Sequence, residues 1–256
     1  MHLNAVAYGS ETAAAPLVIA HGLFGSARNW SAIAKRLALR RRVVVVDMRN
    51  HGDSPRSPVH GYAAMAEDLA ETIGGAGGRV DLMGHSMGGK AAMMLALTEP
   101  ARVNRLIVAD MAPVAYGHSQ IGNVRAMQAL DLAGITRRSE ADAQLAGAVP
   151  ERELRAFFLQ SLALEAGAAS WKLNLETLGA QMPEIMGFPA ISSTFPGPAL
   201  FLTGARSEYV KPVHWARIRA LFPAAEHVAL AGAGHWLHAD ASEVFIQAVD
   251  GFLTSS

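Results

Sequence analysis

The chain contains no cysteine, no excess of either charge and no hydrophobic run long enough to cross a membrane. The lack of cysteine excludes disulfides, thiolate metal sites and a cysteine nucleophile, and it fits a cytoplasmic protein. Basic and acidic residues number 22 each, so the composition favours neither nucleic acid nor an anionic membrane as a partner. The apolar run AAAPLVIA near the start is too short for a membrane span and is better explained as a strand. We therefore expect a cytoplasmic protein without a signal peptide or a transmembrane helix.

What the chain does contain is enough apolar sequence for one large domain. It has 256 residues, of which 51% are hydrophobic and 17% charged, a composition typical of a compact globular protein. Short apolar runs alternate with segments of helical spacing. An apolar run that ends in a glycine turn occupies residues 17–22, with LVIA as its strand. Further strands are expected at residues 43–48, 79–86 and 103–111, and helices at residues 27–40, 62–76 and 87–100. This alternation predicts an α/β fold with a mostly parallel sheet and helices on both faces.

The alternation stops after Met111 and resumes near residue 199. Between these points the spacing is helical and no strand is convincing. Strands are expected again at residues 199–205 and 226–233, and helices at 214–223 and 241–253. The sequence therefore predicts a core domain formed by residues 1–113 and 195–256, with a helical cap inserted at residues 114–194. Such a cap would cover the carboxyl ends of the strands, where open α/β sheets bind ligands.

The sharpest motif is GHSMGG, residues 84–89, which follows a predicted strand and precedes a predicted helix. In this context Gly-x-Ser-x-Gly indicates a strained turn that exposes the hydroxyl of Ser86 as a nucleophile, with small residues that let strand and helix pack closely. The backbone N–H of Met87 would lie at the helix N-terminus and stabilise an oxyanion. An ordinary strand–glycine–helix turn is the alternative explanation.

A second glycine-containing loop, HGLFGS at residues 21–26, follows the strand LVIA. Such a loop can supply the second oxyanion donor, which we assign to the N–H of Leu23, with Phe24 as the alternative. His21 is expected to order the loop through hydrogen bonds.

The ending AGAGHWLH, residues 231–238, follows the last predicted strand and carries the candidate general base. His235 lies on the loop where this base is expected, and His238 is its competitor at the start of the final helical region. His85 precedes the nucleophile and should point away from it if strand alternation holds, whereas His51 lies on a nearby loop. No histidine pair has metal-ligand spacing beside a carboxylate, so we predict no metal.

With these motifs in order, the chain resembles the α/β-hydrolase superfamily over nearly its whole length. The segments VVDMRNHGDSP, GHSMGG, VADMAPVAY and AGHWLHAD together resemble one branch, the small esterases similar to the bacterial YbfF esterase and the mammalian ABHD-eleven type. The resemblance implies an α/β-hydrolase fold, esterase or thioesterase action on acyl substrates, no cofactor, and a helical cap that shapes an acyl crevice.

The acid of the triad is not at the position that is usual in the superfamily. There it follows the strand after the cap as Gly-x-x-Asp, and the matching residue in GARSEYV is Ser207, which cannot orient an imidazole as a carboxylate does. We expect Asp110 to be the acid, because it ends the strand next in sequence to the one bearing Ser86 and because the resembled branch has its acid there. Glu208, one residue off, remains the alternative, followed by Asp240.

The predicted activity is hydrolysis of carboxylic esters or thioesters of small acyl substrates by a Ser86–His235–Asp110 triad. Carbon–carbon bond hydrolysis of the meta-cleavage type uses the same triad and stays open, as does an inactive hydrolase-fold binding protein. We expect a monomer or a homodimer.

The residues expected to contact substrate are Phe24, His85, Trp171 and Trp236. The aromatic and aliphatic residues of the cap that would line an acyl pocket or pack the cap core are Met127, Phe157, Phe158, Trp171, Leu173 and Met182. The possible rim contacts are Arg49, Lys90, Arg206 and Lys211.

Overall fold

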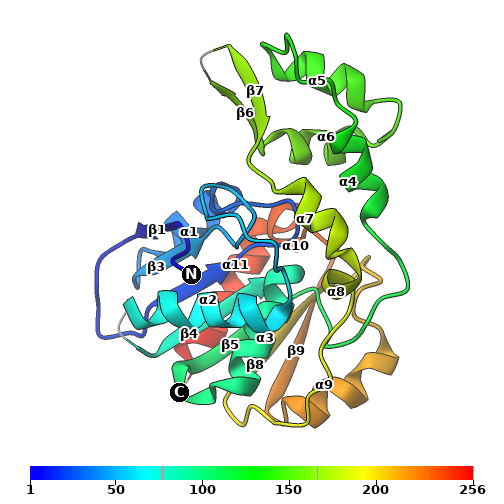
Figure 1. The fold of residues 1–256 in the computed structure, drawn as a ribbon. Helices are drawn as coiled ribbons and strands as arrows, with labels where there is room; N and C mark the ends of the chain where they lie inside the picture. Colours follow the sequence, from blue (N-terminus) through cyan, green and yellow to red (C-terminus); the bar gives the residue numbers. More distant parts are fainter. Residues whose placement is uncertain (76–77, 166, 256) are drawn as a thin grey trace.

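The structure is a computed structural model that describes residues 1–75, 78–165 and 167–255. Its main feature is a seven-stranded sheet with the order β1-β3-β2-β4-β5-β8-β9 (Figure 1). The strands are β1 (Ala5–Tyr8), β2 (Leu17–Ala20), β3 (Val43–Val46), β4 (Val80–His85), β5 (Val103–Ala109), β8 (Ala199–Gly204) and β9 (Ala225–Leu230). Strand β1, which the sequence analysis did not predict, pairs antiparallel with β3, and the other neighbours pair in parallel. The predicted α/β-hydrolase fold is confirmed.

Alternation along the strands divides the core into two layers. In β2, Val18 and Ala20 belong to one hydrophobic cluster, whereas Leu17 and Ile19 belong to the other. Strand β5 divides in the same way, with Leu106 and Val108 on one face and Ile107 and Ala109 on the opposite face. Because side chains alternate across a strand, an uninterrupted apolar run requires helices on both faces of the sheet.

The helices cover the two faces as this pattern requires. On one face, α2 (Tyr62–Gly75), α3 (Met87–Thr98) and α9 (Trp215–Leu221) contribute buried residues, and on the other face α1 (Ser31–Leu37) and α11 (Ser242–Thr254) do so. Short 3₁₀ turns precede α1 and α9 at Ala27–Trp30 and Pro212–His214, and a third connects α3 to β5 at Pro100–Arg102. The helix predicted at residues 62–76 ends at Gly75, and residue 76 lies outside the described residues. No described helix is both long and apolar enough to pass through a membrane.

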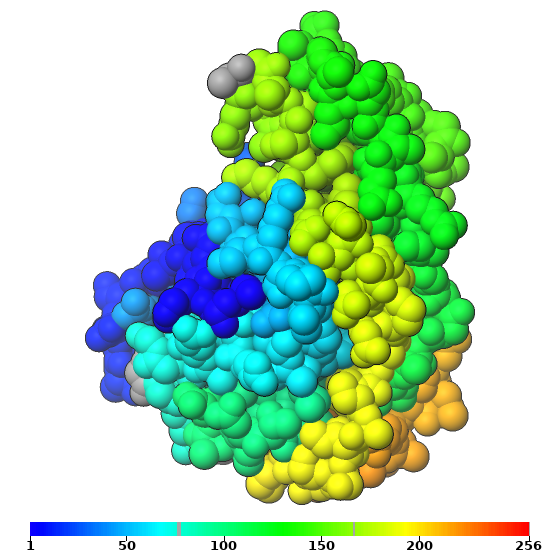
Figure 2. Space-filling model, viewed as in Figure 1, coloured from blue at the N-terminus to red at the C-terminus, as the bar shows by residue number. Residues whose placement is uncertain are grey.

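The segment between β5 and β8 folds outside the sheet. It contains α4 (Ile121–Gln128), α5 (Arg138–Leu145), α6 (Arg152–Leu159), the strands β6 (Leu162–Glu165) and β7 (Ala168–Trp171), α7 (Leu175–Ala180) and α8 (Met182–Met186). In Figure 2 this segment, green to yellow, extends over one end of the molecule, and the surface is notched between the hairpin and the core. The expectation of helical structure throughout was wrong for β6 and β7. Their residues LALE and AASW include good helix formers, but cross-strand pairing of Leu162 with Trp171 overrides that weak preference.

Two hydrogen bonds to backbone carbonyls attach this segment to the loops at the carboxyl ends of the strands. The hydroxyl of Ser161 donates to the carbonyl of Phe24 at 3.1 Å. The backbone N–H of Asn174 donates to the carbonyl of Asn50 at 2.9 Å. The inserted segment therefore lies against the two loops that follow β2 and β3.

Candidate active site

Ser86 occupies a sharp turn between β4 and α3. Its backbone has φ +53° and ψ −119°, a conformation that residues with a side chain rarely adopt. The flanking glycines permit this turn. A Cβ atom on Gly84 would lie 2.2 Å from the carbonyl oxygen of Gly88, and one on Gly88 would lie 2.4 Å from that of Ala20. The Gly-x-Ser-x-Gly spacing thus answers a packing requirement at both glycines.

Asp110 lies beside Ser86 because their strands are neighbours in register. Strand β4 pairs with β5 so that His85 faces Ala109, and the N–H of Ser86 donates to the carbonyl of Ala109 at 3.1 Å. Asp110 also has a positive φ, +52°, and its side chain is fully buried. The N–H of Gly204 donates to Asp110 Oδ1 at 3.1 Å. The carboxylate is therefore held at the carboxyl end of the sheet with its second oxygen turned to other partners.

His235, on the loop between β9 and α10 (Leu237–Asp240), joins these two residues. Its Nδ1 lies 2.7 Å from Asp110 Oδ2, and its Nε2 lies 3.1 Å from Ser86 Oγ. A neutral imidazole that donates from Nδ1 to the carboxylate leaves Nε2 free to accept the proton of the Ser86 hydroxyl. The ring also stacks on Tyr209, with centroids 3.8 Å apart and planes inclined by 16°. The three residues form a continuous Ser–His–Asp contact.

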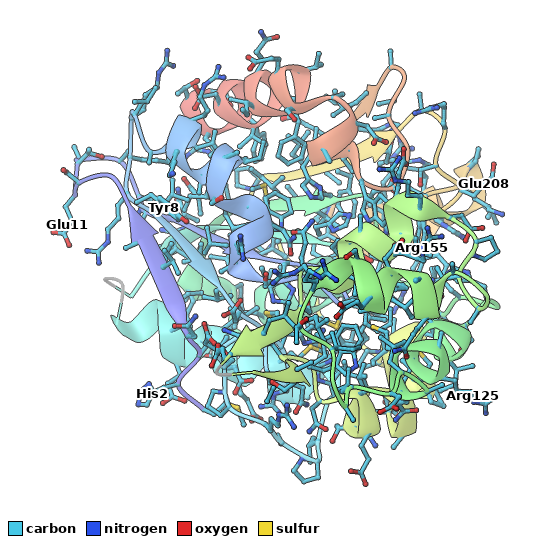
Figure 3. All side chains as sticks on the ribbon, turned by 90° about the horizontal axis from the view of Figure 1, so that it is seen from above. His2, Tyr8, Glu11, Arg125, Arg155 and Glu208 are labelled. Carbon is cyan, nitrogen blue, oxygen red and sulfur yellow. The ribbon has the colours of Figure 1, made fainter. Side chains whose placement is uncertain are left out.

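The two alternative acids have other surroundings. The side chain of Glu208 is 86% exposed and lies 3.1 Å from Lys211 Nζ, and Figure 3 shows it at the periphery of the molecule. The carboxylate of Asp240 accepts the N–H of Gly234 at 2.7 Å, a contact that holds the loop bearing His235. Among the described residues, Asp110 is the carboxylate that contacts His235.

Ser207, which occupies the position where the acid is usual in the superfamily, contacts Asp110. Its hydroxyl donates to Asp110 Oδ2, the oxygen that also faces His235. Its backbone N–H donates to the carbonyl of Gly204 at 2.9 Å, which fixes the loop after β8. This contact was not predicted from the sequence, where position 207 was interpreted only as a place that lacks the usual carboxylate.

The loop at residues 21–26 is held by two buried histidines. His21 Nε2 accepts the N–H of Met48 at 2.9 Å, and His51 Nε2 accepts the N–H of Phe24 at 3.2 Å. Burial lowers the pKa of both imidazoles, most strongly that of His51, which keeps them neutral. The N–H of Phe24 is thus already paired. Leu23 and Met87 line the cavity at Ser86, and Met87 begins α3, where helix N–H groups have no partner within the helix.

A cavity of about 120 Å³ opens above Ser86. Of the residues expected to contact substrate, Phe24, His85 and Trp236 line it, as do Phe157 and Phe158 of the inserted segment. Trp171 is not among its lining residues, because the indole is buried against α4 and donates to the carbonyl of Met127 at 3.1 Å. The lining residues that the sequence analysis did not identify include Asn29, Tyr116, Gln120, Leu154, Ile185, Met186 and Tyr209.

Two further histidines border His235 without replacing it. His85 Nε2 donates to the carbonyl of His235 at 2.9 Å, so its ring supports the loop of the candidate base. The ring of His238 stacks on Trp30, with centroids 4.2 Å apart, and burial lowers its pKa to about 4. A base must accept a proton near neutral pH, and these surroundings favour His235 over His238.

The four basic residues considered for the rim have different surroundings. Arg49 is buried and forms a bidentate pair with Asp68, at 2.6 and 2.8 Å, so its expected place at the rim was wrong. Arg206 and Lys211 are largely exposed. Lys90, in contrast, is buried in the wall of the Ser86 cavity. No three histidine or carboxylate side chains of the described residues are grouped so that they would hold a metal ion.

Comparison with known proteins gives consistent results. A family model described as alpha/beta hydrolase fold matches residues 15–242. The chain is 44% identical over 246 residues to the mouse protein named sn-1-specific diacylglycerol lipase ABHD11, covering 93% of this chain and 80% of that protein. It is 36% identical over 242 residues to the Escherichia coli esterase YbfF, covering 93% and 92% respectively. A solved structure named marine microorganism esterase superposes with a TM-score of 0.93 at 37% identity, covering 98% of this chain and 99% of that one.

Proposed function

This chain belongs to the α/β-hydrolase family and, with relatives named as esterases and a lipase, is an ester hydrolase; we propose that it cleaves its substrates through Ser86, His235 and Asp110. The observation that carries the proposal is the unbroken contact from Ser86 Oγ to His235 at 3.1 Å and from His235 to Asp110 at 2.7 Å.

The reaction proceeds in two acyl-transfer steps. Ser86 Oγ attacks the ester carbonyl carbon while His235 Nε2 takes the hydroxyl proton. The tetrahedral oxyanion accepts hydrogen bonds from the N–H groups of Leu23 and Met87. When the carbon–oxygen bond to the leaving alcohol breaks, His235 returns the proton to that alcohol. Water, deprotonated by the same imidazole, then releases the acid and restores Ser86.

Asp110 acts on the reaction through the imidazole. Its carboxylate holds Nδ1–H of His235, which orients the ring and stabilises the positive charge that develops on it. Ser207 and the N–H of Gly204 hold the carboxylate in turn, one hydrogen bond on each oxygen. A carboxylate fixed in this way loses little free energy to reorganisation during proton transfer.

We also propose a range of substrates and a setting for the enzyme. Thioesters fit the same chemistry, because Ser86 and the oxyanion donors act on the acyl carbonyl in both cases. Residues 114–194 serve as a cap, since Phe157 and Phe158 from this segment line the cavity at Ser86. The absence of cysteine supports a cytoplasmic location. Intact contacts among the three catalytic groups favour an active enzyme over an inactive binding protein.

A substitution series tests the proposal. Purified Ser86→Ala should lose at least about a thousandfold in kcat on p-nitrophenyl butyrate, because no other hydroxyl contacts His235 Nε2 in the described part of the chain. Ser10→Ala, at an exposed serine after β1, should keep the wild-type rate. Equal rates for Ser86→Ala and wild type would refute the assignment of the nucleophile.

A further inference from the structure

Lys90 is a buried cation close to the nucleophile that the proposed reaction does not use. It lies on α3 one turn after Ser86, and its backbone N–H donates to the carbonyl of Ser86 at 3.1 Å. Only 1% of the residue is exposed, yet it lines the same cavity as Ser86. A lysine is rarely buried to this extent without a paired anion, because desolvation of the ammonium group is unfavourable.

The protein satisfies this ammonium group only in part. Lys90 Nζ donates to the carbonyl oxygens of Met186 at 3.0 Å and Gly187 at 2.5 Å, and it lies 4.7 and 5.5 Å from the ring centroids of Tyr116 and Tyr62. These groups are neutral. An ammonium group has three donors, so one remains after the two carbonyls. Among the described residues, no carboxylate lies within 4.0 Å of Nζ. Burial accordingly lowers the pKa of Lys90 to about 7.

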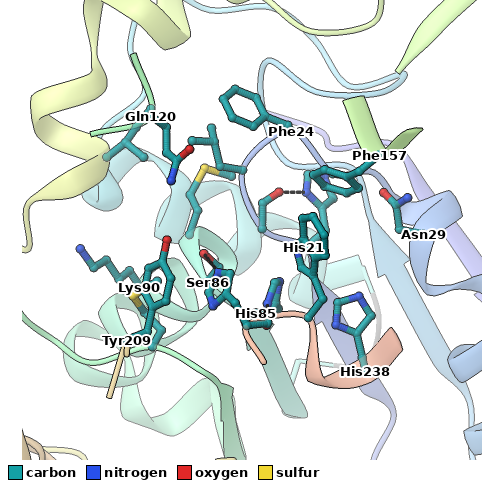
Figure 4. A pocket seen from close by; sticks show the side chains of 18 of the residues that line it. His21, Phe24, Asn29, His85, Ser86, Lys90, Gln120, Phe157, Tyr209 and His238 are labelled. Atoms are coloured by element: carbon teal, nitrogen blue, oxygen red, sulfur yellow. Dashed lines mark hydrogen bonds between the residues drawn. The ribbon is translucent and has the colours of Figure 1, made fainter. Parts of the chain in front are cut away.

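The two sides of the cavity around Ser86 carry different side chains. Figure 4 shows Lys90, Tyr209 and Gln120 on one side of Ser86, called the polar side below, and Phe157 beside Asn29 on the other. Phe24 packs edge-on against Phe158, with centroids 5.2 Å apart, and Phe157 packs against Trp236 at 5.3 Å. An ester bound at Ser86 extends in two directions from its carbonyl carbon, so each side of the cavity receives a different end of the substrate.

We propose that the polar side binds a carboxylate of the substrate through Lys90, which makes Lys90 a specificity-determining residue. The proposal rests on the proposed esterase function and deepens it: the preferred substrate is an ester with an anionic group at one end and an apolar group at the other. A bound carboxylate would supply the missing counter-charge, accept the third ammonium proton and take further hydrogen bonds from the amide of Gln120 or the hydroxyl of Tyr209.

Matched substrate pairs test the proposal at either end of the ester. Mono-p-nitrophenyl adipate and p-nitrophenyl hexanoate differ only in a terminal carboxylate on the acyl side. Acetate esters of 6-hydroxyhexanoate and of hexanol differ in the same way on the alcohol side. In one of the two pairs, wild type should have the larger kcat/KM for the anionic member by about tenfold to a hundredfold, the range of a charge-assisted hydrogen bond. Lys90→Met should bring the ratio of kcat/KM for the anionic member to kcat/KM for the neutral member close to one. Lys90→Arg should keep part of the preference for the anionic member.

Lys35→Met, at an exposed lysine on α1, is the control and should leave the ratio unchanged. The neutral esters test the esterase function separately from the preference for an anionic substrate. Wild type should hydrolyse them, and Ser86→Ala should not. The proposal would be overturned if wild type prefers neither anionic substrate, or if Lys90→Met lowers both members of a pair equally, as the loss of a purely structural contact with α8 would do.

A second measurement needs no variant. Ionisation of His235 affects kcat/KM in the same way for both substrates of a pair, so its effect cancels in the ratio of the two values. Tyr62 and Tyr116 stay neutral across the range because burial raises their pKa, and the pKa of His118 is lowered, chiefly by burial. From about pH 6 to pH 9 the ratio should fall as Lys90 loses its charge. A ratio that does not change with pH would contradict the proposal.

Discussion

Ser207 and His235 contact the same oxygen of Asp110, the first through its hydroxyl and the second through Nδ1 at 2.7 Å. The side chain at the usual position of the acid thus supports the proposed acid, Asp110, which directly follows the neighbouring strand β5. This relationship explains how the imidazole can be oriented although the loop after β8 carries a serine there. It also leads to two predictions on the acid.

Asp110→Asn should lower kcat on p-nitrophenyl butyrate by about a thousandfold or more, because an amide favours the wrong imidazole tautomer and gives no charge stabilisation. Glu208→Gln should change kcat by less than about twofold, since an exposed ion pair with Lys211 contributes little. Steady-state kinetics on both variants checks the ranking. The reverse order would transfer the role of the acid to Glu208.

The double variant Asp110→Asn, Ser207→Asp should recover activity relative to Asp110→Asn alone. The new carboxylate would replace the Ser207 hydroxyl, which now contacts Asp110. It would therefore lie within reach of the His235 imidazole. We expect a recovery of about tenfold in kcat with little change in KM. In a folded double variant, a rate no higher than that of Asp110→Asn would show that position 207 cannot orient the ring.

Gly88→Ala should destabilise the fold by about 2 kcal/mol or more, because its Cβ would lie 2.4 Å from a backbone oxygen of β2. Gly122→Ala, in α4, meets no atom within 4 Å and should leave stability unchanged or raise it by up to about 1 kcal/mol. Urea denaturation of the two variants measures the difference. Equal stability of both would mean that the elbow has more room than the structure shows.

The free energy of unfolding should fall as the pH drops from about 7.5 to 5. Burial lowers the pKa of His238 to about 4 and that of His60 to about 3, so the unfolded chain binds protons between these values and about 6.5 while the folded chain does not. Stability is therefore complete above pH 6.5 and decreases below it. His238→Phe keeps the aromatic stack on Trp30 and should remove about 2 kcal/mol of the loss at pH 5. An unchanged pH dependence in this variant would contradict the burial of a neutral His238.

Much of the fold and of the proposed triad was accessible from the sequence because each depends on local patterns. The apolar runs of β2 to β5 predict their own burial, and Ser86 lies in a motif whose glycines are required by close backbone contacts. Asp110 was accessible through strand order, since a residue that ends the strand next to the nucleophile must lie beside it.

The residues that the sequence did not place depend on tertiary partners. The burial of Arg49 requires Asp68, nineteen positions away, and no local pattern links the two. Trp171 faces α4 because β6 and β7 pair, although their composition favours helix as much as strand. The groups around the Lys90 ammonium are likewise distant in sequence, since they are the carbonyls of Met186 and Gly187 and the rings of Tyr62 and Tyr116.

The most direct measurement is to identify the residue that carries the covalent adduct. After reaction with a fluorophosphonate, peptide mass spectrometry of wild type should find one phosphonylated residue, Ser86, and His235→Ala should react far more slowly, because the imidazole no longer takes the hydroxyl proton. Ser86→Ala should carry no adduct under the same conditions. An adduct on another residue, or full labelling of Ser86→Ala, would contradict the proposed catalytic role of the Ser86–His235–Asp110 contact.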